Sequence, residues 1–421
     1  MPTHRVLPGH APSCAPASAP HAPRASRSRW RGALLTALLC CAAILLHGCE
    51  PLYDAQDFDR EDVPLFRAAN FQAAGDLPTP ATLRTAAWNI KYGAGRVPFW
   101  FDCWGDQVAM DRATVEANLQ AIAELIDEME IDVLMLEEIE VNSRRSSYVD
   151  MVQWLLDHTR LNEGAYFESW NARYVPSEGL GRMNLGNAIL SRYPILQAER
   201  IRQVDRTDQD AVTSAFYIHR SVGRVELRLD ATRKAVALVV HTEAYDNDGT
   251  KQKQIKQIFD LIKAETLPVV VGGDFNELPP TAVRLKEFPD ERTEAVCSAD
   301  FVQPPYTPEV MKPFYEELEP HITLDRYGST EAEQARYFSH SVLGPEETNV
   351  KGEAGDWNRT LDYLFVSKST RWLPGTTDVL QRAGQKVGEL APGATDNRHV
   401  LVANPLLLSD HAPVFGVWEV P

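Results

Sequence analysis

Apolar residues in this chain fall into short runs that end in polar residues, and these runs alternate with segments of helical spacing. Helices are predicted at 112–129, where Asp111 suits the N-cap, at 148–160 and at 252–264. The strand–helix–strand order of 83–136 indicates a crossover unit. Because strands outnumber helices, the pattern predicts a two-sheet α/β sandwich. The predicted strands are 83–90, 131–136, 187–190, 224–229, 235–240, 269–271, 360–366 and 413–420.

Residues 1–48 differ from the rest of the chain. They contain five arginines and no acidic residue, and the apolar run Ala33 to Leu46 follows. That run is short for a bilayer span and has the length of a signal-peptide core. It ends at Leu46-His47-Gly48-Cys49, which resembles a bacterial lipobox with Cys49 as the lipid-attachment residue. We therefore expect a signal peptide at 1–48 and export to the bacterial cell envelope, on the periplasmic side or the cell surface. An uncleaved anchor helix is the alternative.

Charge and cysteine usage narrow the function classes. Loss of the leader would take the net charge from −17 to about −22. Such a charge disfavours loose, field-driven binding to nucleic acid, although not an enzyme that reaches phosphate through a metal. After the leader and Cys49, only Cys103 and Cys297 remain, and an oxidising compartment would permit a disulfide between them.

The remaining chain divides into three parts by composition. Residues 49–82 are acidic and proline-containing, which predicts a tether between the membrane and the domain. Residues 83–421 carry the strand pattern and form the predicted catalytic domain. Within it, 279–355 is long, proline-rich and weakly patterned, as expected of an elaborated surface region that shapes the substrate site. Its aromatic residues can line such a site.

Polar groups follow several predicted strands, at the point where each strand ends. Each has a structural explanation when taken alone: Asn89 can close a turn, and a lone histidine such as His241 is more often structural. Their recurrence is harder to explain by turns, because strand ends are where α/β folds place their chemistry. The residues concerned are Asn89, Glu138, His241, Asp274 with Asn276, Asp362, and Asp410 with His411.

Seven sequence blocks combine these strand-end residues with their neighbours: Trp88-Asn89-Ile90, Leu136-Glu137-Glu138, 186–194, His241-Thr242, Gly273-Asp274-Phe275-Asn276, Leu361-Asp362-Tyr363 and Ser409-Asp410-His411. In this order and spacing, over about residues 83 to 420, they resemble the endonuclease/exonuclease/phosphatase superfamily. The resemblance implies the deoxyribonuclease-I-like fold, a four-layered α/β/β/α sandwich of two mixed sheets flanked by helices.

The resemblance also implies a metal site. Glu138 would be the main ligand of a divalent cation, helped by Asn89 and by Asp410. Mg²⁺ fits because it takes hard oxygen ligands and keeps several waters, with Mn²⁺ as a possible substitute. A cluster of thiolates and histidines at zinc spacing is absent from the sequence, which disfavours zinc. The cation would stabilise the charge that develops on a phosphoester.

The remaining residues would move protons. Asp274 would position and activate the attacking water, with Asn276 beside it for orientation. His411 titrates in a range suited to proton transfer and would be oriented by Asp362. His241 would contact the scissile phosphate or protonate the leaving oxygen.

Two features depart from the family pattern or bear on the substrate. Glu137 stands where glutamine is usual, and Val239-Val240 stand where many members have Asn-Thr. The aromatic segment Phe99 to Trp104 can grip a base or a lipid, or can pack beneath a loop, and packing is the favoured interpretation.

Three functions follow from different classes. The leading prediction is a metal-dependent phosphoester hydrolase, most readily a phosphodiesterase, anchored to the membrane through its N-terminal lipid. Its substrate would be a small molecule, a lipid or a nucleic acid, and no protein partner is evident. The alternatives are an envelope-tethered endonuclease or exonuclease on DNA or RNA and, with less support, a non-catalytic lipoprotein that binds a phosphorylated ligand.

Overall fold

A computed structural model gives the conformation of residues 53, 58–73, 75, 77–291, 302 and 304–420. The predicted leader, Cys49 and Cys297 lie outside these residues. Cys103 forms a disulfide, and its partner also lies outside them. Among the described residues, no helix has the length and apolar character needed to cross a membrane. Pro51–Pro421 forms one compact unit.

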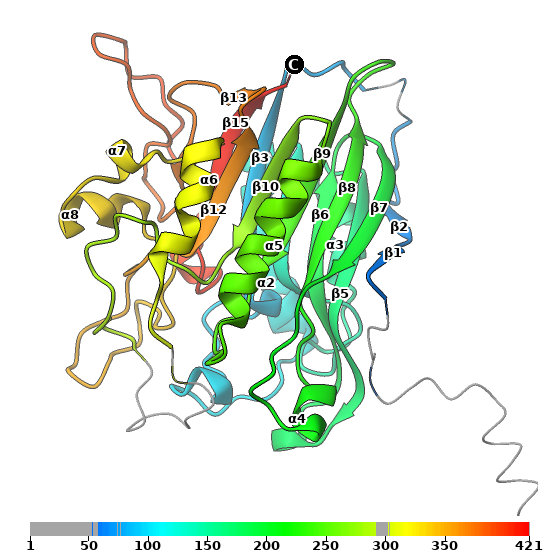
Figure 1. Ribbon diagram of the computed structural model, residues 1–421, viewed down its shortest axis with the longest axis vertical. Coiled ribbons are helices and arrows are strands. Elements are labelled where there is room, and N and C mark those ends of the chain that lie inside the picture. The colour runs from blue at the N-terminus through cyan, green and yellow to red at the C-terminus, as the bar shows by residue number, and fades with distance from the viewer. Residues whose placement is uncertain are drawn as a thin grey trace, which may run out of the picture. The chain divides into compact units, whose positions relative to one another are not determined.

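Two mixed β-sheets form the centre of this unit (Figure 1). One has the order β1 (Arg60–Asp62), β7 (Ile195–Arg202), β8 (Ser221–Arg228), β9 (Lys234–His241), β10 (Val269–Asp274), β12 (Asp362–Ser367), β11 (Leu318–Pro320). The other has the order β13 (Arg371–Trp372), β15 (Val414–Glu419), β3 (Thr82–Asn89), β4 (Val133–Glu140), β6 (Gly181–Ser191), β5 (Glu163–Val175), β2 (Leu65–Arg67), and β14 (Asp378–Val379) also pairs with β15.

Helices cover the outer faces of both sheets. Helix α2 (Arg112–Glu128) and α3 (Met151–His158) pack on the second sheet, and Asp111 caps α2 by accepting from the Thr114 amide. Helix α5 (Thr250–Ala264) and α6 (Lys312–Glu317) lie over the first sheet, as Figure 1 shows. The short helices are α4 (Ala211–Ala215), α7 (Leu324–Tyr327) and α8 (Glu331–Gln334).

Three apolar layers follow from this arrangement. A central layer fills the space between the sheets, and the two outer layers lie between each sheet and its helices. Alternation along the strands produces this: Val269 and Val271 face the α5 side, while Val270 faces the other sheet. The predicted four-layered α/β/β/α sandwich, which is the deoxyribonuclease-I-like fold, is therefore confirmed.

The strands extend beyond those predicted from the sequence. The segment predicted as a tether, 49–82, contains β1 and β2, which lie at the ends of the two sheets. Strands β5 and β7 have no counterpart among the predicted strands, because polar residues interrupt their apolar ones. The ordered fold thus begins before residue 83.

The aromatic segments pack as core. Phe99 is fully buried against Tyr92, with ring centroids 5.1 Å apart, and stacks on Phe101. Packing, the favoured interpretation of this segment, holds for these rings. Within 279–355, Phe314 lies in the layer under α5, and Tyr327 and Tyr337 are buried in the apolar cluster that continues from the central layer. These rings support the region from inside.

Candidate active site

Strand register brings the predicted site residues to one edge of the sandwich. Strands β9 and β10 are parallel and pair His241 with Asp274, while antiparallel β10 and β12 pair Asp274 with Asp362. In the other sheet, parallel β3 and β4 pair Asn89 with Glu137. Because the carboxyl ends of parallel strands meet at the same edge, residues distant in sequence converge here. We call this edge the catalytic edge.

A β-bulge sets the orientation of the carboxylates on β4. Between Leu136 and Ile139 the register to β6 shifts, so that Glu137 and Glu138 lie opposite Asn187 alone. Glu138 takes a φ of 53°, a conformation rare for a residue with a side chain. Its side chain remains 27% exposed, and its Oε1 accepts from Asn89 Nδ2 at 3.2 Å. The bulge thus turns Glu138 toward solvent at the catalytic edge.

Glu137, by contrast, is completely buried. Neither of its oxygens has a hydrogen-bond partner among the described residues. A Cβ added to Gly273 would lie 2.8 Å from Glu137 Oε1 and 2.0 Å from the Val240 carbonyl oxygen, so this glycine makes room for protein groups. Burial, together with the nearby Asp362 and Asp274, raises the pKa of Glu137 well above its ordinary value.

Asp274 lies between two histidines. Its Oδ2 is 3.4 Å from His241 Nε2 and 3.7 Å from His411 Nε2. The other nitrogen of His411, Nδ1, lies 2.9 Å from Asp362 Oδ2, and Asp362 is fully buried. The predicted orientation of His411 by Asp362 is therefore present in the structure.

Asn276 holds Asp274 from the following turn. Its backbone amide donates to Asp274 Oδ1 at 2.8 Å, and its side-chain amide donates to the Thr242 carbonyl at 3.1 Å. Asn276 has a φ of 47°, in the left-handed region that asparagine tolerates better than most residues. The buried ammonium of Lys251 also donates to the Asn276 carbonyl at 3.0 Å. The turn is thereby fixed.

Burial and neighbouring charges perturb the titrations at this edge. Burial raises the pKa of Asp274 to about 7, and the Asp362 carboxylate adds to this effect. Burial alone would lower the pKa of His411, but Asp362, Asp274 and Asp410 raise it to about 10. Burial, with Arg220 nearby, lowers the pKa of His241 well below its ordinary value. At neutral pH the two histidines therefore favour opposite protonation states.

The donor set fits a divalent cation. One ligand atom each from Asp274, Asp362 and His411 lie within 4.8 Å of one another, close enough to hold an ion. Several carboxylates share one buried space, because Glu137 is fully buried near Asp274, Asp362 and Glu138. An arrangement of repelling carboxylates gains most from a bound cation.

Asp410 is in a different environment from the other predicted metal ligands. Its Oδ2 lies 3.6 Å from the buried ammonium of Lys91, which also pairs with Asp102 at 2.7 Å. Its Oδ1 accepts from the Ser409 hydroxyl at 3.2 Å. Asp410 raises the pKa of Glu138, after burial itself, so the two carboxylates lie near each other. Sequence reasoning did not find Lys91, although it lies two residues after Asn89.

The 339–341 segment also reaches the site and was not predicted. Ser341 N donates to the Asp410 carbonyl and Ala412 N donates to the Ser339 carbonyl, at 2.9 and 2.7 Å. In an antiparallel pair these bonds flank a non-hydrogen-bonded pair, here His340 and His411, whose side chains share one face. The two rings lie 4.5 Å apart by their centroids.

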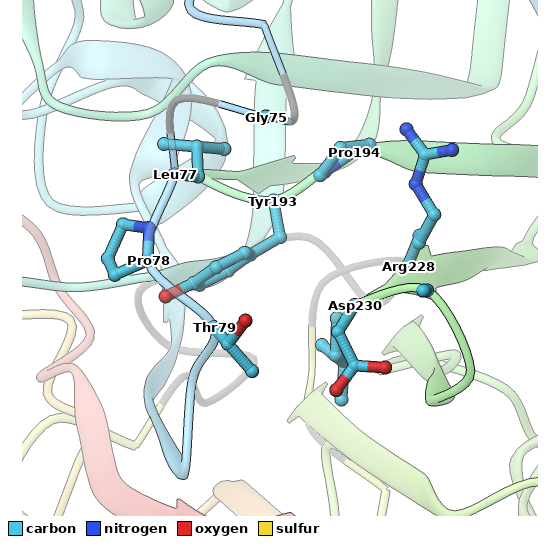
Figure 2. Close-up of a pocket in the computed structure, with 10 residues that line it drawn as sticks. Gly75, Leu77, Pro78, Thr79, Tyr193, Pro194, Arg228 and Asp230 are labelled. Carbon is cyan, nitrogen blue, oxygen red and sulfur yellow. The ribbon is translucent and has the colours of Figure 1, made fainter.

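A cavity of about 370 Å³ lies at the other end of the strands (Figure 2). It is lined by the β6–β7 turn at Tyr193 and Pro194, by Arg228 at the end of β8 and Asp230 after it, and by Gly75 and residues 77–79. Figure 2 shows the Tyr193 ring beside Pro78 and Thr79, and the Arg228 guanidinium points away from that ring. Because β8 and β9 are antiparallel, the end of β8 pairs with the start of β9. The cavity therefore lies at the edge of the sheet away from His241, which ends β9. We call this the opposite edge.

A sandwich with carboxylates, amides and two histidines at one edge defines a class of phosphoester-cleaving enzymes. The chain belongs to the Endonuclease/Exonuclease/phosphatase family, whose model matches residues 86–411. It is a phosphoesterase of that family. No curated protein matches the chain.

Solved structures resemble the chain at low identity. A Bacteroides vulgatus endonuclease/exonuclease/phosphatase is 13% identical, with a TM-score of 0.46 over 81% of this chain and 100% of that one. A Beutenbergia cavernae protein of the same description is 15% identical, with a TM-score of 0.44 over 81% and 72%. The human Nocturnin catalytic domain is 17% identical, with a TM-score of 0.43 over 81% and 94%.

Proposed function

We propose that the protein is a Mg²⁺-dependent phosphodiesterase. The observation that carries this proposal is the position of Asp274, buried between His241 and His411, with Asp362 behind His411. A water beside Asp274 would have a proton acceptor next to it and imidazoles on both sides. General acid–base groups arranged in this way accelerate hydrolysis by about 10²–10⁴-fold.

The titrations support a division of labour. His411, with its raised pKa, stays protonated at neutral pH and donates to a phosphoryl or leaving oxygen. Asp274 is the acceptor of the water proton, because its pKa lies near neutrality. His241 is neutral and hydrogen-bonds the phosphate. Asn276 fixes the carboxylate of Asp274 so that the acceptor does not rotate away.

A divalent cation would be held by Glu138 and Asn89, with Asp410 completing the set, which leaves Asp274 and His411 free for proton transfer. When bound, it neutralises phosphate oxygens and stabilises the developing charge. Mg²⁺ suits these oxygen donors, and Mn²⁺ is the expected substitute. A net charge of −17 over the whole chain favours a small or membrane-borne diester over a long nucleic acid.

We also propose that the enzyme is exported and anchored to the cell envelope through lipid on Cys49. The Arg-rich leader, the apolar run and the Leu46–Cys49 motif support this. Replacement of Cys49 by serine should release the protein from the membrane fraction and abolish labelling with a radioactive fatty acid. Retention of both would overturn the anchor and leave the proposed hydrolase intact.

A substrate panel tests the proposed reaction. The chain from Pro51 is assayed with Mg²⁺ or Mn²⁺ on bis-p-nitrophenyl phosphate, p-nitrophenyl phosphate, plasmid DNA, RNA and sphingomyelin. Chelator-sensitive cleavage of the diester, with the monoester spared, is the expected result. Preferential cleavage of DNA or RNA would identify a nuclease instead. Metal binding without turnover on any substrate would indicate a binding protein.

A further inference from the structure

The segment that brings Ser339 to the catalytic edge comes from the long region between β10 and β12. It pairs with the chain on both sides: Ser339 N donates to the Arg359 carbonyl at 2.8 Å, and its carbonyl accepts from Ala412 N at 2.7 Å. Asp290 fixes the neighbouring turn, because its Oδ2 accepts from Val342 N at 2.6 Å and its Oδ1 pairs with buried Arg359. Ser339 is therefore held in place by its own backbone.

The hydroxyl of Ser339 makes three hydrogen bonds. It accepts from Leu361 N at 3.1 Å and from Asp362 N at 3.2 Å, and it donates to Asp362 Oδ2 at 2.6 Å. A hydroxyl has one proton and two lone pairs. Because two amides occupy the lone pairs and Ser339 is fully buried, the proton has one destination, the Asp362 carboxylate.

This bond bears directly on His411. Asp362 Oδ2 accepts a hydrogen bond from Ser339 Oγ. His411 Nδ1 lies 2.9 Å from the same Asp362 oxygen and 3.0 Å from Asp362 Oδ1. Two donors fix the plane of the carboxylate, and that plane fixes the imidazole. The orientation of His411 Nε2 toward Asp274, at 3.7 Å, depends on it.

We propose that Ser339 is a positioning residue for phosphoester hydrolysis, acting through Asp362 on His411. This inference rests on the proposed function, in which His411 is the proton donor. It assigns to the 279–355 region a part in catalysis beyond the expected shaping of the substrate site. Loss of the hydroxyl would let the carboxylate and the imidazole rotate, which lowers the rate of the chemical step more than substrate binding.

Ser341 provides a matched control. It lies two residues along the same segment and is equally buried, but its hydroxyl donates to the Leu343 carbonyl at 2.8 Å. Replacing it removes a buried hydroxyl of the same kind while leaving Asp362 untouched. A purely structural role for Ser339 would make the two serines equivalent.

The kinetic test compares Ser339→Ala, Ser339→Thr and Ser341→Ala with wild type on bis-p-nitrophenyl phosphate and Mg²⁺. For Ser339→Ala we expect kcat to fall by about 10–100-fold while KM changes by less than about threefold. Threonine keeps the hydroxyl and should restore most of kcat. Ser341→Ala should lower the unfolding midpoint without lowering kcat. Equal kcat in the two alanine variants would overturn the proposal.

A spectroscopic test separates this inference from the proposed function. The Nδ1 proton of His411, bonded to a buried carboxylate, should give a downfield proton resonance, assigned by its loss in His411→Asn. We expect Ser339→Ala to shift or broaden it and Ser341→Ala to leave it unchanged. If wild type cleaves no phosphoester but the resonance responds in this way, the proposed function fails and the positioning contact stands. A resonance unchanged in Ser339→Ala would overturn the contact itself.

Discussion

The carboxylates at strand ends are hydrogen-bonded differently at the two edges of the sandwich. At the opposite edge, Asp230 accepts from the amides of Thr232 and Arg233, from the Thr232 hydroxyl and from the Arg233 guanidinium. These bonds hold the pKa of Asp230 well below its ordinary value. At the catalytic edge, Glu137 is buried and neither of its oxygens is hydrogen-bonded to any residue that the structure describes, and Glu138 and Asn276 have positive φ.

The difference separates folding from function. A carboxylate that ends a strand for structural reasons is satisfied by its own turn, as Asp230 is. Carboxylates crowded together and held in uncommon conformations cost stability, and they persist where the surrounding fold over-determines them. We therefore expect the carboxylates of the catalytic edge, where a cation and a substrate would bind, to lower the stability of the metal-free protein. The opposite edge should not have this effect.

Replacing one aspartate at each edge should give the largest contrast. Asp274→Ala removes the proposed proton acceptor, and we expect kcat on a generic diester to fall by about 10³-fold or more. Asp230→Ala should leave kcat at the wild-type value. Circular dichroism would confirm that both variants are folded. Substantial activity in folded Asp274→Ala would remove Asp274 from the mechanism.

The pH dependence of the unfolding free energy should reveal the repulsion among the buried carboxylates of the catalytic edge. A carboxyl whose pKa is raised in the folded state, from 3.8 to about 7 for Asp274, contributes stability that is fully present below the lower value. That contribution is lost as pH rises through about 7, and Glu137 acts in the same direction. We expect the chelated protein to lose about 2 kcal/mol between pH 5 and 8. Mg²⁺ should reverse the loss, as calorimetry at both pH values would show.

Glu137→Gln should make the catalytic edge more like the opposite edge. The substitution keeps the shape and removes a buried carboxyl that has no hydrogen-bond partner in the described part of the chain, so we expect the metal-free protein to gain about 1–2 kcal/mol at pH 8. Its stability should also depend less on pH. Denaturant unfolding with chelator measures both effects. A variant that is less stable than wild type at pH 8 would show that Glu137 has a favourable partner.

Thr232→Ala tests the other side of the comparison and should have the smallest effect. The hydroxyl is one of several donors to Asp230, and the turn is exposed. We expect the unfolding midpoint to change by about 1 °C or less, with activity unchanged. A large loss of stability would mean that the opposite edge also depends on a finely balanced polar network.

The sequence was sufficient to predict the layers and the convergence of the site. Residues such as Asn89, Asp274 and His411 each end an apolar run, and family spacing joined them into one edge. Local pattern also located α2 with its Asp111 cap. These features are encoded within a few residues of each position.

Contacts between residues far apart in the sequence could not be predicted from such local patterns. Ser339 lies 23 residues before Asp362 in a region without clear periodicity, and only the fold brings the two together. The bulge at Glu137 and Glu138 depends on the register between β4 and β6. Strands β1 and β2 are three residues each, too short for a periodic signal.

Those two short strands have a consequence for how the domain can be handled. A single stretch, Arg60–Arg67, supplies the outermost strand at one end of each sheet, because β1 pairs with β7 and β2 pairs with β5. A protein trimmed to residue 83 would bare two rows of unpaired amides and carbonyls at once, and bare strand edges recruit other chains. We therefore expect Arg60–Arg67 to protect the two sheets from pairing with other chains, and a recombinant enzyme should retain this segment.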